Sequence, residues 1–296
     1  MAKGFAHRQG IDLARFIAAF GVCVAHAFSA ENDWDGHVSL ALFTILTAFL
    51  SMQSMQRSGQ YAVMQRVRRL LLPWLVWSAF YKLVWWKVSD GQMGLFALSD
   101  PWSLLVGASE HLWFLPFVAL AMFLVQPLGR LVTNPVRLAT GLVVLLAVAL
   151  PMYLGHQRPG LPVPFPQWLF AFPVYALGLM MALAHGMARP WWPVVAAAAL
   201  SAEALWATGG LALAYTVLAA ALAFEAFWRL PVQHPILPRL GQAAFGIYLL
   251  HPFFMLVTFK FLGPEVNRML AAVLTFLMAW GATVALRRLP LFVKLT

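Results

Sequence analysis

Apolar residues fill most positions of this chain, in long runs separated by short polar connections. A run of about 20 apolar residues is the length that an α-helix needs to cross a lipid bilayer. The pattern predicts an all-α integral membrane protein of about ten transmembrane helices, near residues 11–30, 38–56, 70–88, 111–129, 137–155, 166–187, 191–208, 211–229, 241–261 and 268–286. We expect residues 1–296 to form one polytopic membrane domain, because no linker or second soluble domain is visible.

Composition and charge agree with this interpretation. The chain is 62% hydrophobic and 10% charged, whereas soluble domains carry about 25% charged residues. The net charge of +10 would suggest nucleic acid for a soluble protein, but here we expect no such partner, because the charge follows the loops. Alternate connections hold most basic residues: Lys3 and Arg8; Arg57, Arg66, Arg68 and Arg69; Arg130 and Arg137; Arg189; Arg229 and Arg239; Arg287, Arg288 and Lys294.

The intervening connections hold most of the acidic residues, among them Glu31, Asp33, Asp90, Asp100 and Glu265. The positive-inside rule assigns the basic set to the cytoplasm. Both termini are then cytoplasmic, which requires an even number of helices. We expect residues 11–30 to be a retained helix rather than a signal peptide, because charged residues would interrupt the apolar region of such a signal.

The first apolar run carries two polar groups that point the same way. Arg15 and His26 are eleven residues apart, which is about three helical turns and roughly 16 Å along the axis. Such groups are costly in lipid, so we expect both to face a protein-lined cavity. His26 can exchange a proton near neutral pH, whereas Arg15 is suited to electrostatic or phosphate contacts. The small residues between them, Ala18, Ala19 and Val22, leave room for either a narrow ligand or a neighbouring helix.

Two arginines precede the predicted third helix on the cytoplasmic side. Arg66 and Arg69 are three residues apart and would share one helical face. They could anchor the helix at the membrane surface, or they could bind a phosphate group. The sequence alone leaves both interpretations open.

Two further patterns suggest polar sites within the membrane. Glu110 and His111 begin the fourth predicted helix at the outer surface, where they would either anchor the helix or complete a site at the level of His26. Tyr248 and His251 are expected near mid-membrane in the ninth helix. At that depth both need hydrogen-bond partners, which a neighbouring helix or a substrate could supply. No Cys/His spacing suggests a metal site.

These patterns together resemble the acyltransferase family 3, the membrane-bound O-acyltransferases of bacterial surface glycans, in their stand-alone form. Four patches carry the resemblance in the family's order: Asp12-Leu13-x-Arg15 with ten residues before His26; Arg66-x-x-Arg69; His111-Leu112-Trp113-Phe114-Leu115; and Ile247-Tyr248-Leu249-Leu250-His251-Pro252. Two departures affect the expected shape of the pocket, because Thr47-Ala48-Phe49 replaces the usual Ser-Gly-Phe element and Ala244-Phe245 replaces the usual Ser-Tyr.

The resemblance implies an acyl-CoA donor, such as acetyl-CoA, and a glycan or lipid-linked saccharide acceptor outside a bacterial cytoplasmic membrane. It implies no metal. Under this hypothesis Arg15, Arg66 and Arg69 bind the donor, and His26 acts as the general base. His111 or Trp113 stabilises the oxyanion or positions the sugar, and the acceptor contacts are assigned to Glu110, Tyr248 and His251. An acyl-His26 intermediate stays open, and so does a different function, that of a lipid-linked glycan flippase or proton-coupled transporter using the same cavity.

Overall fold

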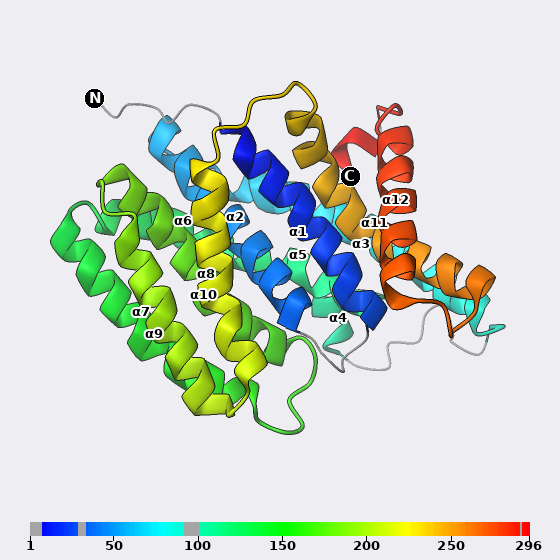
Figure 1. Ribbon diagram of the computed structural model, residues 1–296, viewed down its shortest axis with the longest axis horizontal. Coiled ribbons are helices and arrows are strands. Elements are labelled where there is room, and N and C mark those ends of the chain that lie inside the picture. The colour runs from blue at the N-terminus through cyan, green and yellow to red at the C-terminus, as the bar shows by residue number, and fades with distance from the viewer. Residues whose placement is uncertain (1–7, 29–33, 92–100, 291) are drawn as a thin grey trace.

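Helices and short turns build the molecule, which a computed structural model describes over residues 8–28, 34–91, 101–290 and 292–296 (Figure 1). No β-strand occurs in these ranges. The longer helices are α1 (Gln9–Phe28), α2 (Trp34–Ser58), α3 (Val63–Val88), α7 (Pro135–His156), α8 (Phe165–Gly186), α9 (Trp191–Thr208), α10 (Leu211–Arg229), α11 (Leu237–Leu262) and α12 (Arg268–Leu286). The shorter ones are α4 (Ser103–Val106), α5 (Phe114–Ala121) and α6 (Val125–Leu131), with the 3₁₀ turns η1 (Glu110–Trp113), η2 (Met122–Leu124) and η3 (Phe292–Lys294).

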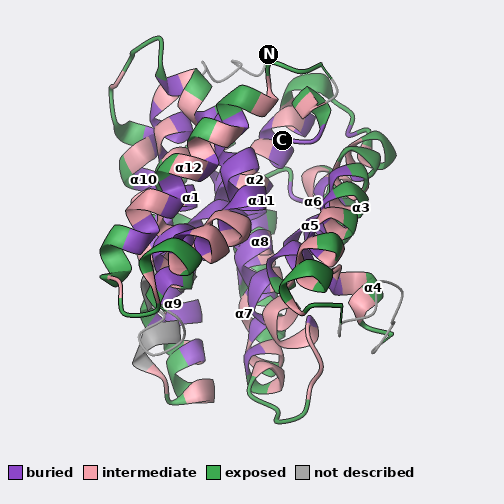
Figure 2. Cartoon of the chain, turned by 90° about the vertical axis from the view of Figure 1, so that its right-hand side faces the viewer, coloured by how far each residue is buried: buried purple, intermediate pink, exposed green. Residues whose placement is uncertain are grey.

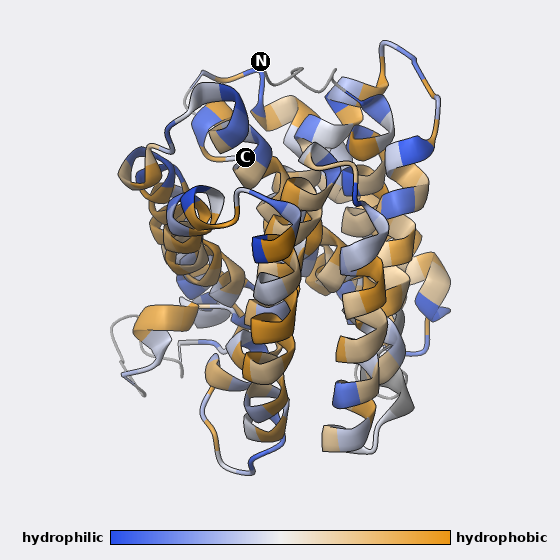
Figure 3. Ribbon diagram, turned by 90° about the vertical axis from the view of Figure 1, so that its left-hand side faces the viewer, coloured by the Kyte–Doolittle hydropathy of each residue, from blue (hydrophilic) through white to orange (hydrophobic). Residues whose placement is uncertain are grey.

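Each of the ten predicted ranges overlaps a helical stretch. Seven stretches in the described residues are long and apolar enough to cross a membrane: Gln9–Phe28, Val38–Ser58, Glu110–Leu131, Pro135–His156, Phe165–Gly186, Leu237–Leu262 and Arg268–Leu286. Figure 3 shows this pattern, with hydrophobic residues along the helices and hydrophilic ones concentrated at their ends. The helices α3, α9 and α10 match the other three predicted ranges, but in the described residues they do not meet the same requirement for length and apolar character. The total of ten therefore stays a prediction.

The side of the membrane on which the termini lie also stays a prediction. Lys3, Glu31, Asp33 and Asp100, which contributed to the expected orientation, lie outside the described residues. The start of α1 and residues 292–296 lie at the same end of the bundle in Figure 1. That placement is the one expected for an even number of crossings.

The predicted fourth helix is irregular at two places, its start and its middle. Instead of one helix over 111–129, the structure has η1, α5, η2 and α6 in succession. A proline lacks the N–H for an intrahelical hydrogen bond and crowds the carbonyl four residues earlier. For Pro116 and Pro127 these carbonyls belong to Leu112 and Phe123, which lie in η1 and η2. The two 3₁₀ turns thus fall where the prolines disturb the helix.

The third helix starts earlier than predicted. It begins at Val63 rather than at residue 70, so Arg66 and Arg69 lie on the helix instead of preceding it. Nothing in the sequence near Val63 forbids helical backbone, and the prediction was wrong because it required apolar residues from the first turn. α3 packs mainly against α5, and near its start Arg66 contacts Ser54 of α2.

The centre of the molecule is built from α1, α2, α8 and α11. α1 packs between α2 and α11, and α2 also packs against α8; Figure 2 shows buried residues concentrated along these helices. Glycines permit the close approaches, since a Cβ at Gly241 would lie 2.8 Å from the Cα of Asp12 and a Cβ at Gly178 would lie 2.8 Å from the carbonyl oxygen of Ile45. These contacts set the register of α11 on α1 and of α8 on α2.

The small residues of α1 serve this packing. Ala18 and Ala19 are 1% exposed and Val22 is 7% exposed. All three belong to the main hydrophobic core. Of the two interpretations open from the sequence, the close approach of neighbouring helices accounts for them.

Candidate active site

Three histidines from separate parts of the chain meet at one place. The ring centroid of His251 lies 4.8 Å from that of His26 and 5.4 Å from that of His111. They come from α11, α1 and η1. Two tyrosines border them, because the ring centroid of Tyr81 lies 4.9 Å and that of Tyr248 lies 5.6 Å from His111. We call His26, His111 and His251 the histidine cluster; it unites residues that the sequence analysis selected separately.

Hydrogen bonds to the backbone hold the cluster together. The Tyr248 hydroxyl donates to the carbonyl oxygen of His111, and the Tyr81 hydroxyl donates to that of Leu249 at 2.6 Å. His251 Nδ1 lies 2.6 Å from the carbonyl oxygen of Tyr248. These bonds link α3, η1 and α11 around the two buried imidazoles.

Two imidazole nitrogens in the cluster are buried without a partner. His111 and His251 are 6% and 0% exposed, and the Nε2 atom of each lacks a hydrogen-bond partner in the described part of the chain. His111 Nδ1 lies 3.0 Å from Ser109 Oγ. His26 is exposed, so the cluster combines one accessible imidazole with two buried ones. A buried polar atom without a partner is costly, so the site suits a polar ligand.

The depth expected for α11 is corrected by these contacts. The sequence placed His251 and Tyr248 near mid-membrane and His26 near the outer end of its helix, yet the rings of His26 and His251 touch. We measure along each helix axis from the contact between Asp12 and Gly241. His26 then lies about 21 Å along α1, and His251 lies about 15 Å along α11. The side chains span the remaining difference. The sequence does not show this register, because it depends on where the two helices touch.

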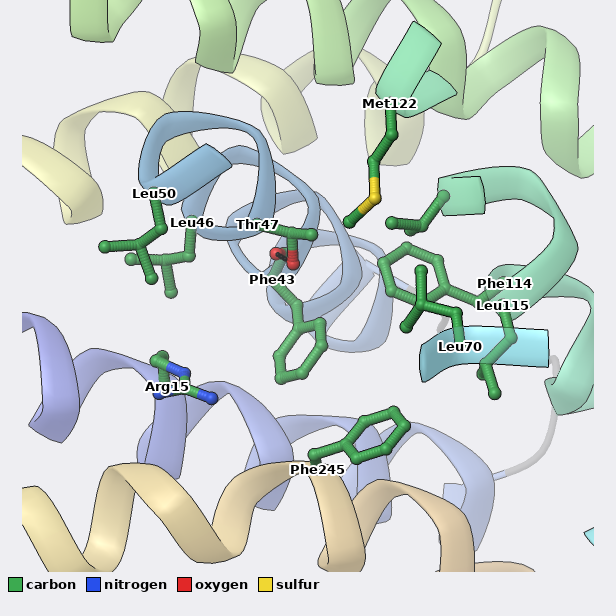
Figure 4. Close-up of a pocket in the computed structure, with 11 residues that line it drawn as sticks. Arg15, Phe43, Leu46, Thr47, Leu50, Leu70, Phe114, Leu115, Met122 and Phe245 are labelled. Carbon is green, nitrogen blue, oxygen red and sulfur yellow. Dashed lines mark hydrogen bonds between the residues drawn. The ribbon is translucent and has the colours of Figure 1, made fainter. Parts of the chain in front are cut away.

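Arg15 faces a separate pocket of about 200 Å³. Its walls come from α1, α2, α3, α5, η2 and α11: Phe43, Leu46, Thr47, Leu50, Leu70, Phe114, Leu115, Val118, Met122 and Phe245. Figure 4 shows the guanidinium pointing towards the rings of Phe43 and Phe245. Arg15 is the one charged side chain among these lining residues. The expected cavity around Arg15 is therefore present, although α2 and α5 supply most of its wall.

Both departures from the family pattern lie on this wall. Thr47 and Phe245 line the pocket, at the positions where the family pattern has a Ser-Gly-Phe element and a Ser-Tyr pair. The Thr47 hydroxyl donates to the carbonyl oxygen of Phe43 at 2.8 Å, so it is used within α2. These two positions make the pocket more apolar than the usual residues would.

Three aromatic rings separate the pocket from the histidine cluster. Phe43 and Phe114 line the pocket, and their ring centroids lie 6.0 and 5.8 Å from that of Tyr248 and 5.8 Å from each other. Tyr248 in turn contacts His111 and His251. We call Phe43, Phe114 and Tyr248 the ring layer. Sequence reasoning missed Phe43, because one phenylalanine in an apolar helix gives no signal.

The predicted arginine pair lies near the start of α3, where Arg66 contacts the last turns of α2. Arg66 Nη2 donates to Ser54 Oγ at 2.6 Å, and its guanidinium lies 4.6 Å from the centroid of the Tyr61 ring. Burial raises the pKa of the Tyr61 hydroxyl, and the charge of Arg66 opposes this shift, so the phenol stays neutral and does not neutralise Arg66. Arg69 is exposed and precedes Leu70, which lines the pocket.

The other two predicted site residues lie beside the histidine cluster. Trp113 is 7% exposed and its ring packs against Phe114 and Phe117, with centroids 5.7 and 5.8 Å away. Glu110 is exposed at the start of η1. In the part of the chain that the structure describes, no group of three or more His, Cys, Asp or Glu side chains is arranged to hold a metal ion.

A family model described as an acyltransferase domain (Acyl_transf_3) matches residues 8–288. The match covers α1 through α12 and so includes every residue of the histidine cluster and of the pocket. No curated protein and no solved structure matches the chain.

Proposed function

The chain belongs to the acyltransferase 3 family, whose chemistry is acyl transfer onto a hydroxyl group, and on that premise we propose which substrates meet at which residues. The donor is a cytoplasmic acyl-CoA, most simply acetyl-CoA. The acceptor is a hydroxyl of a glycan or lipid-linked saccharide on the outer side of a bacterial cytoplasmic membrane. Ten crossings with both termini in the cytoplasm would place the two substrates on opposite sides. The meeting of three imidazoles around His26 carries this proposal.

His26 acts as the general base in this reaction. It removes the proton of the acceptor hydroxyl while the oxygen attacks the thioester carbonyl. The C–S bond then breaks, and the thiolate takes up the proton from His26, which leaves an ester and free CoA. A positioned general base contributes typically about 10²–10⁴-fold. Its exposure suits a base that must reach an acceptor from outside.

The neighbours of His26 supply the remaining polar contacts. With the Ser109 hydroxyl donating to Nδ1, His111 carries its proton on Nε2, where a buried donor without a protein partner suits a developing oxyanion. Glu110, Tyr248 and His251 are assigned to the acceptor side, and Trp113 supports the wall behind Phe114. Direct transfer needs no second nucleophile, whereas an acyl-His26 intermediate would need one further hydrolysis or transfer step at the same imidazole.

The donor lies along the inner half of the protein. CoA has phosphates at one end and the thioester at the other, joined by a slender arm. Arg66 and Arg69 bind the phosphate end at the inner surface, and the arm enters the apolar pocket past Leu70 with Arg15 as its charged contact. A guanidinium binds phosphate or carbonyl oxygen through directional, charge-assisted hydrogen bonds.

The test uses protein purified in detergent with labelled acetyl-CoA and an acceptor glycan. We expect covalent transfer by the wild type and its loss in His26→Ala, while His234→Ala, which alters an exposed histidine in the connection before α11, keeps full activity. Turnover by His26→Ala contradicts the general-base role. Absence of any covalent product, together with glycan movement across sealed vesicles, would favour the flippase or proton-coupled transporter instead.

A further inference from the structure

We propose that three buried hydroxyl groups, together with the guanidinium of Arg66, bind the phosphate that joins the arm of the CoA donor to its nucleotide. The hydroxyl groups belong to Ser51, Tyr61 and Tyr175, which we call the hydroxyl cluster. The inference rests on the proposed function, because it takes the donor to be a CoA thioester. It adds three uncharged binding residues that lie outside the four sequence motifs.

The Arg15 pocket continues into a polar stretch on two helices. On α2, Thr47 lines the pocket, and Ser51 follows four residues later, about one turn further along the same face. On α3, Leu70 lines the pocket, and Arg66 precedes it by four residues on the same face. The end of α2 and the start of α3 are joined by a short connection. Ser51 and Arg66 therefore both lie beyond the pocket on the side of this connection.

Contacts between these elements bring the hydroxyl cluster together beside Arg66. Arg66 Nη2 donates to Ser54 Oγ at 2.6 Å, and its guanidinium lies 4.6 Å from the centroid of the Tyr61 ring. The Ser51 side chain interacts with the phenol groups of both Tyr61 and Tyr175, and the charge of Arg66 acts on the same two phenols. The four side chains thus come from α2, α3, α8 and the connection between α2 and α3.

The two phenol groups are buried without a protein partner that satisfies them. Ser51, Tyr61 and Tyr175 are 5%, 3% and 0% exposed. Neither phenol oxygen makes a hydrogen bond of normal geometry with a described residue, and the single proton of Ser51 serves only one of them at a time. A buried hydroxyl without a partner is costly. Two of them beside a guanidinium indicate a ligand that accepts hydrogen bonds and carries negative charge, as a phosphate ester does.

The order of groups in the donor places its phosphate at this position. In a CoA thioester the arm separates the reacting carbonyl from the first phosphate. Phe43 of the ring layer and Ser51 are eight residues apart on α2, which is about 12 Å along the helix axis, so an arm that fills the pocket has its two ends near the ring layer and near the hydroxyl cluster. Arg66 is half-buried and has five N–H groups, so donors remain besides the one used by Ser54.

The test compares two fragments of the donor, 4′-phosphopantetheine and pantetheine, which differ only by this phosphate. Calorimetric titration of the detergent-purified protein should show tighter binding of 4′-phosphopantetheine by the wild type. Tyr175→Phe should weaken that binding by about 10–150-fold, as expected for the loss of one hydrogen bond to a charged group, and should leave the Kd for pantetheine unchanged. Tyr61→Phe should act in the same way and carries the prediction if Tyr175→Phe does not fold.

Tyr153→Phe is the matched control. Tyr153 is 0% exposed and its hydroxyl also lacks a hydrogen-bond partner in the described part of the chain, but it lies on α7, which supplies no residue to the pocket. Its replacement should leave both Kd values unchanged. Without ligand, all three variants should unfold at the wild-type temperature or above it, because each loses a buried hydroxyl without a partner.

The proposal is overturned if Tyr175→Phe and Tyr61→Phe keep the wild-type preference for 4′-phosphopantetheine, or if Tyr153→Phe loses it equally. Displacement of 4′-phosphopantetheine by added phosphatidylglycerol would identify a lipid headgroup as the occupant and would overturn the assignment to the donor. Failure of the proposed function is distinguishable, because the wild type would then bind neither CoA nor its two fragments.

Discussion

Replacing Arg15 by methionine tests whether the pocket binds the donor. Methionine keeps an unbranched stem of similar length, so the packing against α2 and α11 is retained while the charge is removed. The other ten residues of the wall are uncharged, so no neighbouring cation in the wall takes over the lost contact. A hydrogen bond to a charged group contributes about 1.5–3 kcal/mol, and each 1.4 kcal/mol is a factor of ten in affinity. The Kd for CoA should therefore rise by about 10–150-fold.

Arg69 provides the matched comparison. It is exposed, and an exposed ion pair contributes about 0.2–1 kcal/mol, so Arg69→Met should weaken CoA binding by less than about sixfold. Arg66, which is partly engaged by Ser54 and Tyr61, should fall between the two. Adding Arg66→Ala to Arg69→Ala should reduce donor affinity more than it changes acceptor selectivity.

Calorimetric titration of the detergent-purified protein with CoA measures these differences, and thermal unfolding of each variant checks that the fold is intact. The reasoning is refuted if Arg15→Met binds CoA as tightly as the wild type. It is refuted equally if Arg69→Met loses as much affinity as Arg15→Met, because the burial of the pocket would then have no influence on binding.

Two further predictions concern stability in detergent, measured by thermal or denaturant unfolding. Glu225 Oε1 lies 2.7 Å from His185 Nε2, and Glu225 Oε2 lies 2.7 Å from Nη2 of Arg229, whose side chain is 43% exposed. Glu225→Ala should lower the free energy of unfolding by about 1–3 kcal/mol, because it leaves the buried His185 unpaired, whereas Arg229→Ala should lower it by less than about 1 kcal/mol. Equal losses in the two variants would contradict this prediction. Gly178→Ala should destabilise by about 1–3 kcal/mol, because its Cβ would lie 2.8 Å from atoms of α2. Gly281→Ala, with no atom within 4 Å of its Cβ, should be neutral or stabilising, and a similar loss in both variants would contradict the packing argument.

The helices could be predicted from the sequence because apolar length alone defines them. Every expected range overlaps helical backbone, and the membership in the acyltransferase 3 family agrees with the resemblance drawn from four short motifs. The errors arose where side-chain chemistry acts on the backbone locally. The turns before Pro116 and Pro127 needed the rule for the carbonyl four residues earlier, and the basic start of α3 was excluded by a rule that demands apolar residues.

The candidate site could be predicted only in part. The spacing of Arg15 and His26 predicted one polar face of α1, and Arg15 does face a pocket. The contact between His26 and His251 could not be predicted, because it depends on the register that Gly241 sets against Asp12. Ser109 and Tyr81, which hold His111 and the backbone of α11, gave no signal in the sequence, since their types are common and their partners lie far along the chain.

The ring layer gives the proposed reaction an order of events. A donor arm in the Arg15 pocket and a hydroxyl beside His26 lie on opposite sides of Phe43, Phe114 and Tyr248, so the thioester reaches His26 only after a ring moves. Tyr248 is held by its hydrogen bond to the His111 carbonyl, whereas the two phenylalanines have no polar group to hold them. Rotation of Phe43 or Phe114 is therefore the less costly way to join the two spaces, and a donor that fills the pocket is placed to drive it. Because the same rings keep water that reaches the exposed His26 away from the thioester, the layer favours transfer over hydrolysis until the arm is in place.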